Sequence, residues 1–161
     1  MADFDRIVAE MGPALRRVAA AYERDAALRE DLLQDMLVAI ARSLPKLRDE
    51  ARLRPFVFRI AHNKGVDHVA RHAAEPQAEE VPDDLPRQDG SPEDHLIARQ
   101  RSERLWAAVR RLELPYRQVI ALLMEDLTYA EIAEALGIGV SNVGVRINRA
   151  KTLLRSLLDH G

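Results

Sequence analysis

An all-α fold of two small helical domains joined by an acidic flexible linker is predicted from three features of this sequence. Aromatic residues make up only 4% of its 161 residues, while Ala, Leu, Arg and Glu recur at helical spacing. A central stretch rich in Pro and carboxylates divides the chain. The hydrophobic content of 47% is enough to bury a core on either side of that stretch. We therefore expect an N-terminal helical bundle, a C-terminal helix-turn-helix bundle and no strands.

The composition also indicates where the protein works. There are no cysteines, which excludes disulfides and thiolate metal sites and is typical of a reducing compartment. Asp3, Asp5 and Arg6 interrupt the region where a signal peptide needs an apolar run. No later segment offers the roughly 18 uncharged apolar residues that a membrane span requires. We expect a cytoplasmic protein without membrane insertion.

The first domain, 1–73, is expected to contain a long amphipathic helix over 28–44. Apolar side chains recur there at three- and four-residue intervals and define one face: Leu32, Leu33, Met36, Leu37, Ile40 and Leu44. The opposite face carries Glu30, Asp31, Gln34 and Asp35 near the helix start, where carboxylates complement the helix dipole. From these residues alone, the acidic face is either a solvated surface or a binding surface.

A basic helix follows this one after a polar loop, 46–52. Pro45 ends the first helix, and Pro55 suits the first turn of the next because its missing N–H is not needed there. The basic helix combines cations, an amide, histidines and aromatic rings: Arg54, Phe56, Phe58, Arg59, His62, Asn63, Lys64, His68, Arg71 and His72. Cations neutralise phosphates, and amides and rings read or stack bases, so this combination suits single-stranded or melted DNA.

Two features of the basic helix also have plainer interpretations. Phe56 fits a core position better than a base-stacking one. His62, His68 and His72 lack an accompanying cluster of carboxylates at ligand spacing, so we expect no metal site and no cofactor.

The middle of the chain is predicted to be a linker over 74–95. Eight carboxylates against Arg87 alone give residues 75–94 a formal charge of −7, so the remainder carries +5 of the total of −2. Four prolines and one glycine interrupt helix there: Pro76, Pro82, Pro86, Gly90 and Pro92. The acidic chain is either a simple tether or a mimic of nucleic acid that occupies a basic channel.

The C-terminal domain, 96–161, contains the most specific pattern, a helix-turn-helix. Thr128 and Glu131 have the spacing of a capping box, which starts a short helix. Gly137 allows the turn, because glycine adopts positive φ without strain. The next helix buries Val143, Ile147, Ala150 and Leu154 and leaves amide and guanidinium groups outside, as major-groove recognition requires. An ordinary helical hairpin would give a similar spacing.

Two segments together resemble the hallmark regions of extracytoplasmic-function (ECF) sigma factors of bacterial RNA polymerase. One is REDLLQDMLVAIARSLPKLRDEARLRPFVFRIAHNKGVDHVARH, which is similar to the region that binds polymerase and melts the promoter. The other is LPYRQVIALLMEDLTYAEIAEALGIGVSNVGVRINRAK, which is similar to the region that binds the upstream promoter element. The segments occur in the family's order, and the likeness covers nearly the whole chain.

This resemblance implies a sigma factor that directs promoter-specific transcription initiation in response to an envelope or environmental stress signal. Its partners would be core RNA polymerase, promoter DNA and an anti-sigma factor, with no small-molecule substrate. The face of Glu30, Asp31, Gln34 and Asp35 would meet the polymerase clamp helices. The minus-ten element would be contacted from the loop 46–52, which resembles a receiver of a flipped base, and from the basic helix. The implied minus-ten residues are Arg48, Arg52, Asn63, Lys64, Asp67 and Arg71.

The resemblance assigns the minus-thirty-five element to the second helix of the helix-turn-helix. The implied contact residues are Asn142, Gly144, Val145, Arg146, Asn148, Arg149, Lys151 and Arg117, with Arg155 a further phosphate partner. Three positions depart from the family pattern. Phe56 replaces a frequent tryptophan and keeps an aromatic side chain in the core, and the other two lie in the helix-turn-helix. Gly144 replaces a commonly basic residue, and Gly139 stands where a serine often caps the helix, a position that glycine fills less well.

Other classes of protein explain less of the sequence. A one-component regulator that uses only the helix-turn-helix would need an effector domain, and residues 1–73 show no ligand-pocket motif. A mimic that binds an anti-sigma factor without DNA would not need a basic recognition helix. No nucleophile–base pair, glycine-rich phosphate loop or metal spacing indicates an enzyme.

Overall fold

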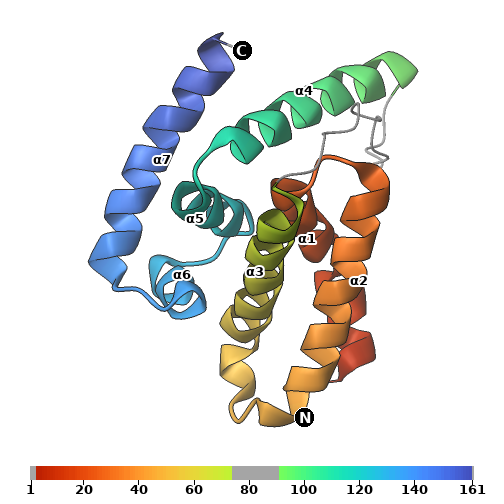
Figure 1. Ribbon diagram of the computed structural model, residues 1–161, viewed down its shortest axis with the longest axis vertical. Helices are drawn as coiled ribbons and strands as arrows, with labels where there is room; N and C mark the ends of the chain where they lie inside the picture. The colour runs from red at the N-terminus through yellow and green to blue at the C-terminus, as the bar shows by residue number, and fades with distance from the viewer. Residues whose placement is uncertain (1–2, 74–90, 161) are drawn as a thin grey trace.

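The computed structural model describes residues 3–73 and 91–160, and every regular element within these ranges is helical (Figure 1). The helices are α1 Phe4–Tyr22, α2 Ala26–Ser43, α3 Leu53–His72, α4 Pro92–Arg111, α5 Leu114–Met124, α6 Tyr129–Leu136 and α7 Val140–His160. Two short 3₁₀ turns, η1 Leu44–Lys46 and η2 Glu50–Arg52, connect α2 to α3. The predicted all-α class is confirmed.

Three helices, α1 to α3, form the N-terminal bundle. Side chains cap the first two: a carboxylate oxygen of Asp3 accepts from the N–H of Asp5, and one of Asp25 accepts from Leu28. The helix predicted over 28–44 is α2, which buries Leu32, Leu33, Met36 and Ile40 as its periodicity indicates. After α2 the chain continues into η1, where Pro45 occupies the first turn.

Helices α1 and α3 approach each other closely at Gly65. A Cβ atom added to Gly65 would lie 2.4 Å from Cδ2 of the Tyr22 ring, far inside van der Waals contact. The Tyr22 hydroxyl in turn hydrogen-bonds Nδ1 of the fully buried His62. Gly65 therefore lets α3 lie directly against a ring that is itself held in place.

The second half begins with α4, which lies above α1, α2, α3 and α5 in Figure 1. The hydroxyl of Ser91 accepts from the N–H of Asp94 at 3.2 Å, Pro92 occupies the first turn, and carboxylates there complement the helix dipole. Most of the segment predicted as a linker, 74–90, lies outside the described residues. Its last four residues, 92–95, form the first turn of α4.

Helices α6 and α7 form the predicted helix-turn-helix. The capping box is present: the N–H of Glu131 donates to the Thr128 hydroxyl at 3.1 Å, and the N–H of Thr128 donates to the Glu131 carboxylate at 2.9 Å. Gly137 ends α6 with φ of 69°, the left-handed conformation that glycine adopts freely. In α7, Val143, Ile147 and Ala150 are buried and Leu154 is half-buried, which follows the predicted apolar stripe.

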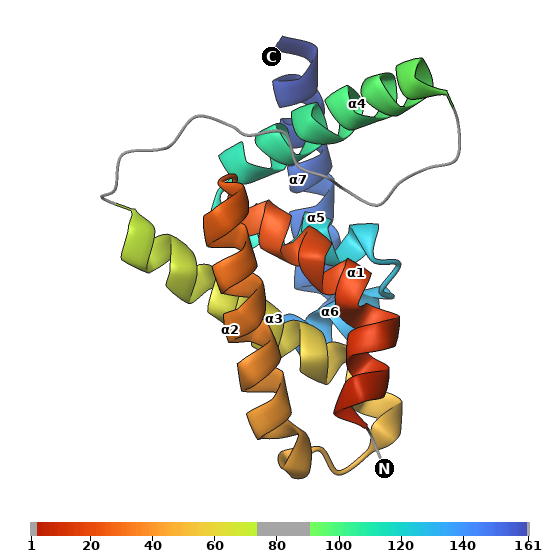
Figure 2. The same ribbon diagram turned by 90° about the vertical axis from the view of Figure 1, so that its right-hand side faces the viewer.

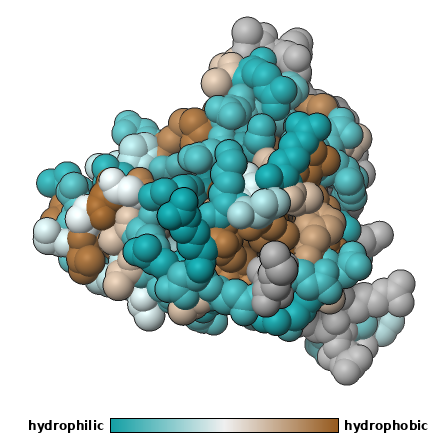
Figure 3. Space-filling view, turned by 90° about the horizontal axis from the view of Figure 1, so that it is seen from below, coloured by the Kyte–Doolittle hydropathy of each residue, from teal (hydrophilic) through white to brown (hydrophobic). Residues whose placement is uncertain are grey.

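The two halves pack directly on one another. Helix α1 contacts α4 and α5, and α3 contacts α5 and α6, so buried residues of both halves form one continuous hydrophobic cluster (Figure 2). From below, the surface is mainly hydrophilic, with apolar side chains gathered in a recess between polar ones (Figure 3). The structure therefore presents the two halves in a closed arrangement.

Candidate nucleic-acid interface

A cavity of about 270 Å³ lies between the loop that follows α2 and the first turns of α3. Its lining residues are Lys46, Leu47, Arg48, Asp49, Arg52, Pro55, Phe56, Arg59 and Glu134. The cations among them come from the loop predicted to receive a base and from the start of the basic helix. Phe58 is buried in the core, whereas Phe56 is half-buried and lines the cavity. The cavity thus combines cations with one aromatic ring.

The second half of the chain contributes Glu134 to this cavity, from α6. The Glu134 carboxylate lies 2.7 Å from Nε of Arg52. Arg59 donates from Nη2 to the carbonyl oxygen of Glu134 at 2.8 Å and from Nε to that of Ala135 at 3.3 Å. These two carbonyls belong to the last turn of α6, where the helix dipole favours a cation. Two cavity cations therefore bind groups of α6.

The remaining predicted minus-ten residues lie further along α3. Asn63 and Asp67 are exposed and line a shallow hollow against Leu114, Pro115 and Gln118 of the second half. Asn63 and Asp67 thus lie beside the first turns of α5 in this arrangement. Lys64 is half-buried. Arg71 lies 3.6 Å from the carboxylate of Asp35 on α2, an exposed pair.

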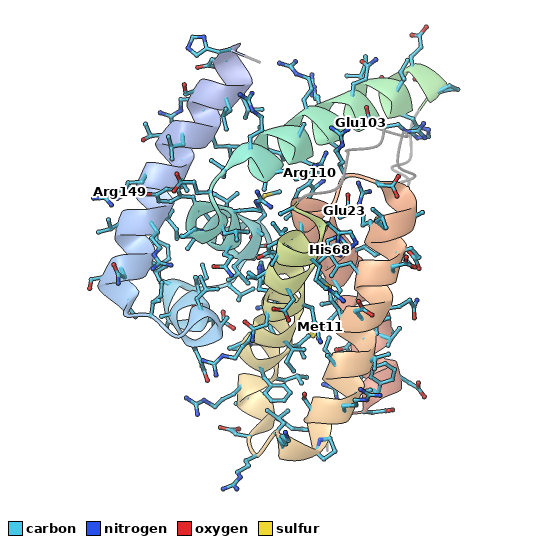
Figure 4. All side chains as sticks on the ribbon, in the orientation of Figure 1. Met11, Glu23, His68, Glu103, Arg110 and Arg149 are labelled. Carbon is cyan, nitrogen blue, oxygen red and sulfur yellow. The ribbon has the colours of Figure 1, made fainter. Side chains whose placement is uncertain are left out.

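The outer face of α7 is open to solvent along the residues predicted to bind DNA. Asn142, Val145, Asn148, Arg149 and Lys151 are exposed, and Gly144 and Arg146 are half-buried. Figure 4 places Arg149 on α7, on the side of the molecule away from α2. The added Cβ of Gly144 would meet only Tyr129, at 3.7 Å, so this turn of α7 has space for a side chain. The face combines amides with cations, as base-edge and phosphate contacts require.

Arg117 is the predicted DNA contact that the structure places elsewhere. Its guanidinium donates to the carbonyl oxygens of Arg110 and Leu112, at 2.6 and 3.0 Å, and lies 5.9 Å from the centre of the Tyr22 ring. Burial lowers the pKa of Arg117 from its ordinary value. These contacts close the end of α4 and join it to α1, so the Arg117 side chain does not extend into solvent beside α7.

The acidic face of α2 lies on the outside of the bundle. Glu30, Asp31, Gln34 and Asp35 are all exposed. Glu30 forms an ion pair with Arg16 at 3.2 Å, in addition to the pair between Asp35 and Arg71. The structure therefore presents this predicted set together on one surface.

The three histidines of α3 make contacts within the protein. Nε2 of His68 lies 2.8 Å from the carboxylate of Glu23, and Figure 4 shows these side chains next to each other. Nδ1 of His72 donates to the carbonyl oxygen of His68 at 2.9 Å. Burial lowers the pKa of His62 to about 3, so this ring is neutral in the folded protein. Within residues 3–73 and 91–160, no group of three or more His, Asp or Glu side chains is arranged to hold a metal ion. None of the helices there combines the length and the apolarity of a membrane span.

The contacts between the halves include residues that the sequence pattern did not indicate. Arg17 of α1 forms a bidentate pair with Glu125 at the end of α5, with N–O distances of 2.8 and 2.7 Å. Glu125 is buried, and its hydrogen bonds raise the pKa of Arg17. Arg54 of α3 donates to the carbonyl oxygen of Glu125 at 2.8 Å. Local spacing does not indicate these contacts, because Arg17 and Arg54 lie 108 and 71 positions from Glu125 in the chain.

Comparison with known protein families gives two matches that span the two halves. Residues 7–75 match the family described as sigma-70 region 2, and residues 102–154 match the family described as sigma-70, region 4. The acidic face and the cavity's lining residues other than Glu134 lie within the first match, and Glu134 and the exposed face of α7 lie within the second.

Individual proteins resemble the chain over most of its length. The ECF RNA polymerase sigma factor ShbA of Streptomyces griseus is 32% identical over 139 residues, which cover 81% of this chain and 71% of ShbA. The RNA polymerase sigma factor NccH of Alcaligenes xylosoxydans is 28% identical over 165 residues, covering 97% and 87%. Among solved structures, CnrH of Cupriavidus metallidurans in complex with the cytosolic domain of CnrY superposes with a TM-score of 0.68 at 27% identity, over 98% of this chain and 88% of that one.

Proposed function

Because this chain belongs to the ECF family of RNA polymerase sigma factors, which bind core polymerase and direct initiation at promoters, we propose a division of this work along the chain. Residues 1–73 bind polymerase and read and melt the minus-ten element. Residues 96–161 read the minus-thirty-five element, and 74–95 connect the two domains. The observation that carries this proposal is the presence of two separate faces, the cavity with α3 and the outer side of α7, within the two matched regions.

The minus-ten function is assigned to the cavity and to the polar residues of α3. A base extruded from opening DNA would enter between the cations and Phe56, where Arg48 and Arg52 contact its phosphate or edge. Asn63, Lys64, Asp67 and Arg71 follow along the helix and contact the same strand. The cavity is large enough for one base. Its guanidinium and ammonium groups are hydrogen-bond donors, which suit the phosphate oxygens and base acceptors of nucleic acid.

The minus-thirty-five function is assigned to α7. Its exposed amides and cations, together with Gly144, Val145 and Arg146, enter the major groove, and their exposure in the closed arrangement supports the assignment. Arg117 remains a weaker candidate, because its guanidinium already binds three groups of this chain.

Polymerase binding is assigned to the acidic face of α2, where Glu30, Asp31, Gln34 and Asp35 are exposed together. The protein acts in the cytoplasm, as a binding factor without catalytic activity of its own. An anti-sigma factor restrains it until an envelope or environmental stress signal arrives. The structure of CnrH with the cytosolic domain of CnrY supports such a partner.

Charge reversal on α2 tests the polymerase assignment. The double variant Asp31→Lys/Asp35→Lys should lose most binding to core RNA polymerase, because four units of charge change on the proposed contact surface. Since both side chains are exposed, the free energy of unfolding should change by no more than about 0.5 kcal/mol. Titration of labelled protein with core polymerase measures the loss of binding. Transcription over a promoter library measures the resulting loss of activity, and urea denaturation measures the free energy of unfolding.

The control is Glu10→Lys, which reverses one exposed carboxylate on α1 and is compared with the single variants Asp31→Lys and Asp35→Lys, which change the charge by the same two units. Glu10→Lys should bind core polymerase and transcribe as the wild type does. Equal core affinity of the double variant and the wild type would remove the acidic face from the proposed polymerase contact.

A further inference from the structure

The outward face of α7 has an apolar centre between polar groups. Val145 lies in the second turn of α7, and the helical phase places it opposite Val143 and Ile147, which are buried. The Val145 side chain is 46% exposed. Residues three and four positions away are its neighbours on the helix surface, and the exposed ones are polar: Ser141, Asn148 and Arg149. The middle of the proposed reading face therefore presents methyl groups.

Gly144 and Tyr129 extend this apolar centre toward α6. A Cβ atom added to Gly144 would lie 3.7 Å from Cε2 of the Tyr129 ring, an ordinary contact distance. Tyr129 is the first residue of α6, and its side chain is 42% exposed. Because glycine places no side chain between them and the solvent, the ring edge of Tyr129 remains accessible beside Val145. An apolar surface thus continues from the recognition helix onto the helix before it.

The groups around this surface indicate what covers it. Arg149 and Lys151 are exposed on α7 within two turns of Val145, and Asn148 is exposed between them and Val145. Cations and amides in this arrangement suit phosphates and base edges. An apolar protein surface docked on Val145 would leave these cations without a partner of opposite charge. Duplex DNA neutralises the cations and places base edges against the centre of the face.

The major groove contains one kind of group that matches an apolar centre. Every base pair presents hydrogen-bond donors and acceptors there, and A·T pairs add an apolar group, the C5 methyl of thymine. A polar base edge against Val145 would lose water without gaining a hydrogen bond, which is unfavourable. A thymine methyl loses no hydrogen bond, and its contact with Val145 removes apolar surface of both groups from water. The patch therefore favours thymine.

Resting on the assignment of α7 to the minus-thirty-five element, we propose that Val145 is a specificity-determining residue that recognises the C5 methyl of one thymine. The Tyr129 ring forms the second wall of this contact, beside the bare backbone of Gly144. A recognition helix reads bases with its N-terminal turns, and Val145 lies there. Arg149, one turn later, anchors the helix to a base edge or phosphate, and the methyl contact selects a neighbouring base pair.

Uracil in place of thymine tests this contact directly, because it removes the C5 methyl and keeps the hydrogen-bonding groups of the base. The probe is a pool of duplexes with about 12 randomised base pairs, slightly more than one helical turn, from which the full chain selects its preferred sequence. The enriched duplex is then synthesised with each thymine replaced in turn by uracil. At one position the wild type should bind the uracil duplex about three- to fourfold more weakly, as expected for the loss of one buried methyl group.

The variants are compared by the ratio of their affinities for the thymine and the uracil duplex at that position. In Val145→Ala the ratio should approach unity, and in Tyr129→Ala it should fall to about two, because one wall of the contact is lost. Leu153→Ala is the matched control, since Leu153 is an apolar residue of α7 with a similar exposed fraction, 44%, and lies two turns further along. It should keep the wild-type ratio. Each ratio compares two duplexes with the same variant, so changes in folding or in overall affinity cancel.

The outcomes separate this inference from the proposed function. Equal affinity of the wild type for thymine and uracil at every enriched position would overturn the methyl contact and leave α7 as a DNA-binding helix. An unchanged ratio in Val145→Ala would also overturn it, and an unchanged ratio in Tyr129→Ala would remove the ring from the contact. If no sequence were enriched from the pool, the minus-thirty-five assignment would fail, and the inference would fail with it.

Discussion

The two helices proposed to read DNA, α3 and α7, are held in the fold in different ways. Helix α3 packs against α1, α2, α5 and α6 and buries two histidines and a glycine in addition to apolar side chains. Helix α7 packs against α4, α5 and α6 through an apolar stripe, with Val143, Ile147 and Ala150 its buried residues. Most outer residues of α7 are exposed to solvent, whereas Arg59 of α3 donates to carbonyl oxygens at the end of α6. The proposed contact face of α7 is open to solvent, whereas part of the proposed face of α3 lies against the second half of the chain.

The difference in packing between α3 and α7 is tested most strongly by replacing one glycine of each helix with alanine. In Gly65→Ala the new Cβ meets the Tyr22 ring at 2.4 Å, and that ring is buried and hydrogen-bonded to His62. Overpacking of this kind lowers the free energy of unfolding by about 3 kcal/mol, and the better helix propensity of alanine offsets about 1 kcal/mol of this loss. We expect a net loss of about 2 kcal/mol in the free energy of unfolding, measured by urea denaturation.

Gly144→Ala is the counterpart on α7. Its Cβ would meet only Tyr129, at an ordinary 3.7 Å, so this variant should be as stable as the wild type or up to about 1 kcal/mol more stable. Equal losses at the two positions would mean that α3 is not more tightly enclosed than α7, which would contradict the comparison.

The open face of α7 can be tested in DNA binding. Arg149→Ala should weaken binding to the minus-thirty-five element by about 1–3 kcal/mol and flatten the preference at one base pair if the side chain forms a bidentate base contact. A phosphate contact would instead weaken all sequences alike and lower the salt slope by about one. Competition binding at several salt concentrations distinguishes these signatures. Arg42→Ala, an exposed cation of α2, is the control, and an Arg149→Ala affinity equal to that control would remove Arg149 from the reading face.

The buried histidine of α3 predicts a smaller effect, on pH dependence. The pKa of His62 is about 3 in the folded protein and about 6.5 in the unfolded chain, so below pH 6.5 the unfolded chain binds a proton that the folded protein does not. Stability is therefore lost as pH falls from about 6.5 toward 3, by about 1 kcal/mol between pH 6.5 and 5.5. Urea denaturation at these two pH values should show this loss in the wild type and a smaller one in His62→Gln. Equal losses would show that another group causes the dependence.

The sequence predicted those parts of the fold that depend on neighbours along the chain. The capping box of Thr128 and Glu131, the turn at Gly137 and the apolar stripes of α2 and α7 are local patterns, and each is present. The Arg17–Glu125 pair and the approach of Gly65 to Tyr22 depend on which helices meet, and spacing does not carry that information.

The proposed DNA contacts divide in the same way, into residues that a local pattern indicates and residues whose surroundings depend on tertiary packing. The exposure of Arg149 follows from the helical phase of Val143 and Ile147, and the phase can be read from the sequence. The Arg117 side chain is of the type that binds phosphate. In the structure, however, its guanidinium contacts carbonyl oxygens at the end of α4 and the Tyr22 ring. A cation's partner is decided by tertiary packing, so residue type alone does not separate a DNA contact from an internal bond.

The contacts of Arg59 with the end of α6 give the closed chain a particular response to electrolyte. Both are hydrogen bonds to backbone carbonyls, which carry no net charge and are little affected by dissolved ions. Phosphate binding, in contrast, releases condensed counterions and weakens steeply as salt rises. An increase in ionic strength would therefore weaken phosphate contacts of the Arg59 guanidinium more than its two bonds to α6, and it would screen the exposed Arg52–Glu134 ion pair between the halves.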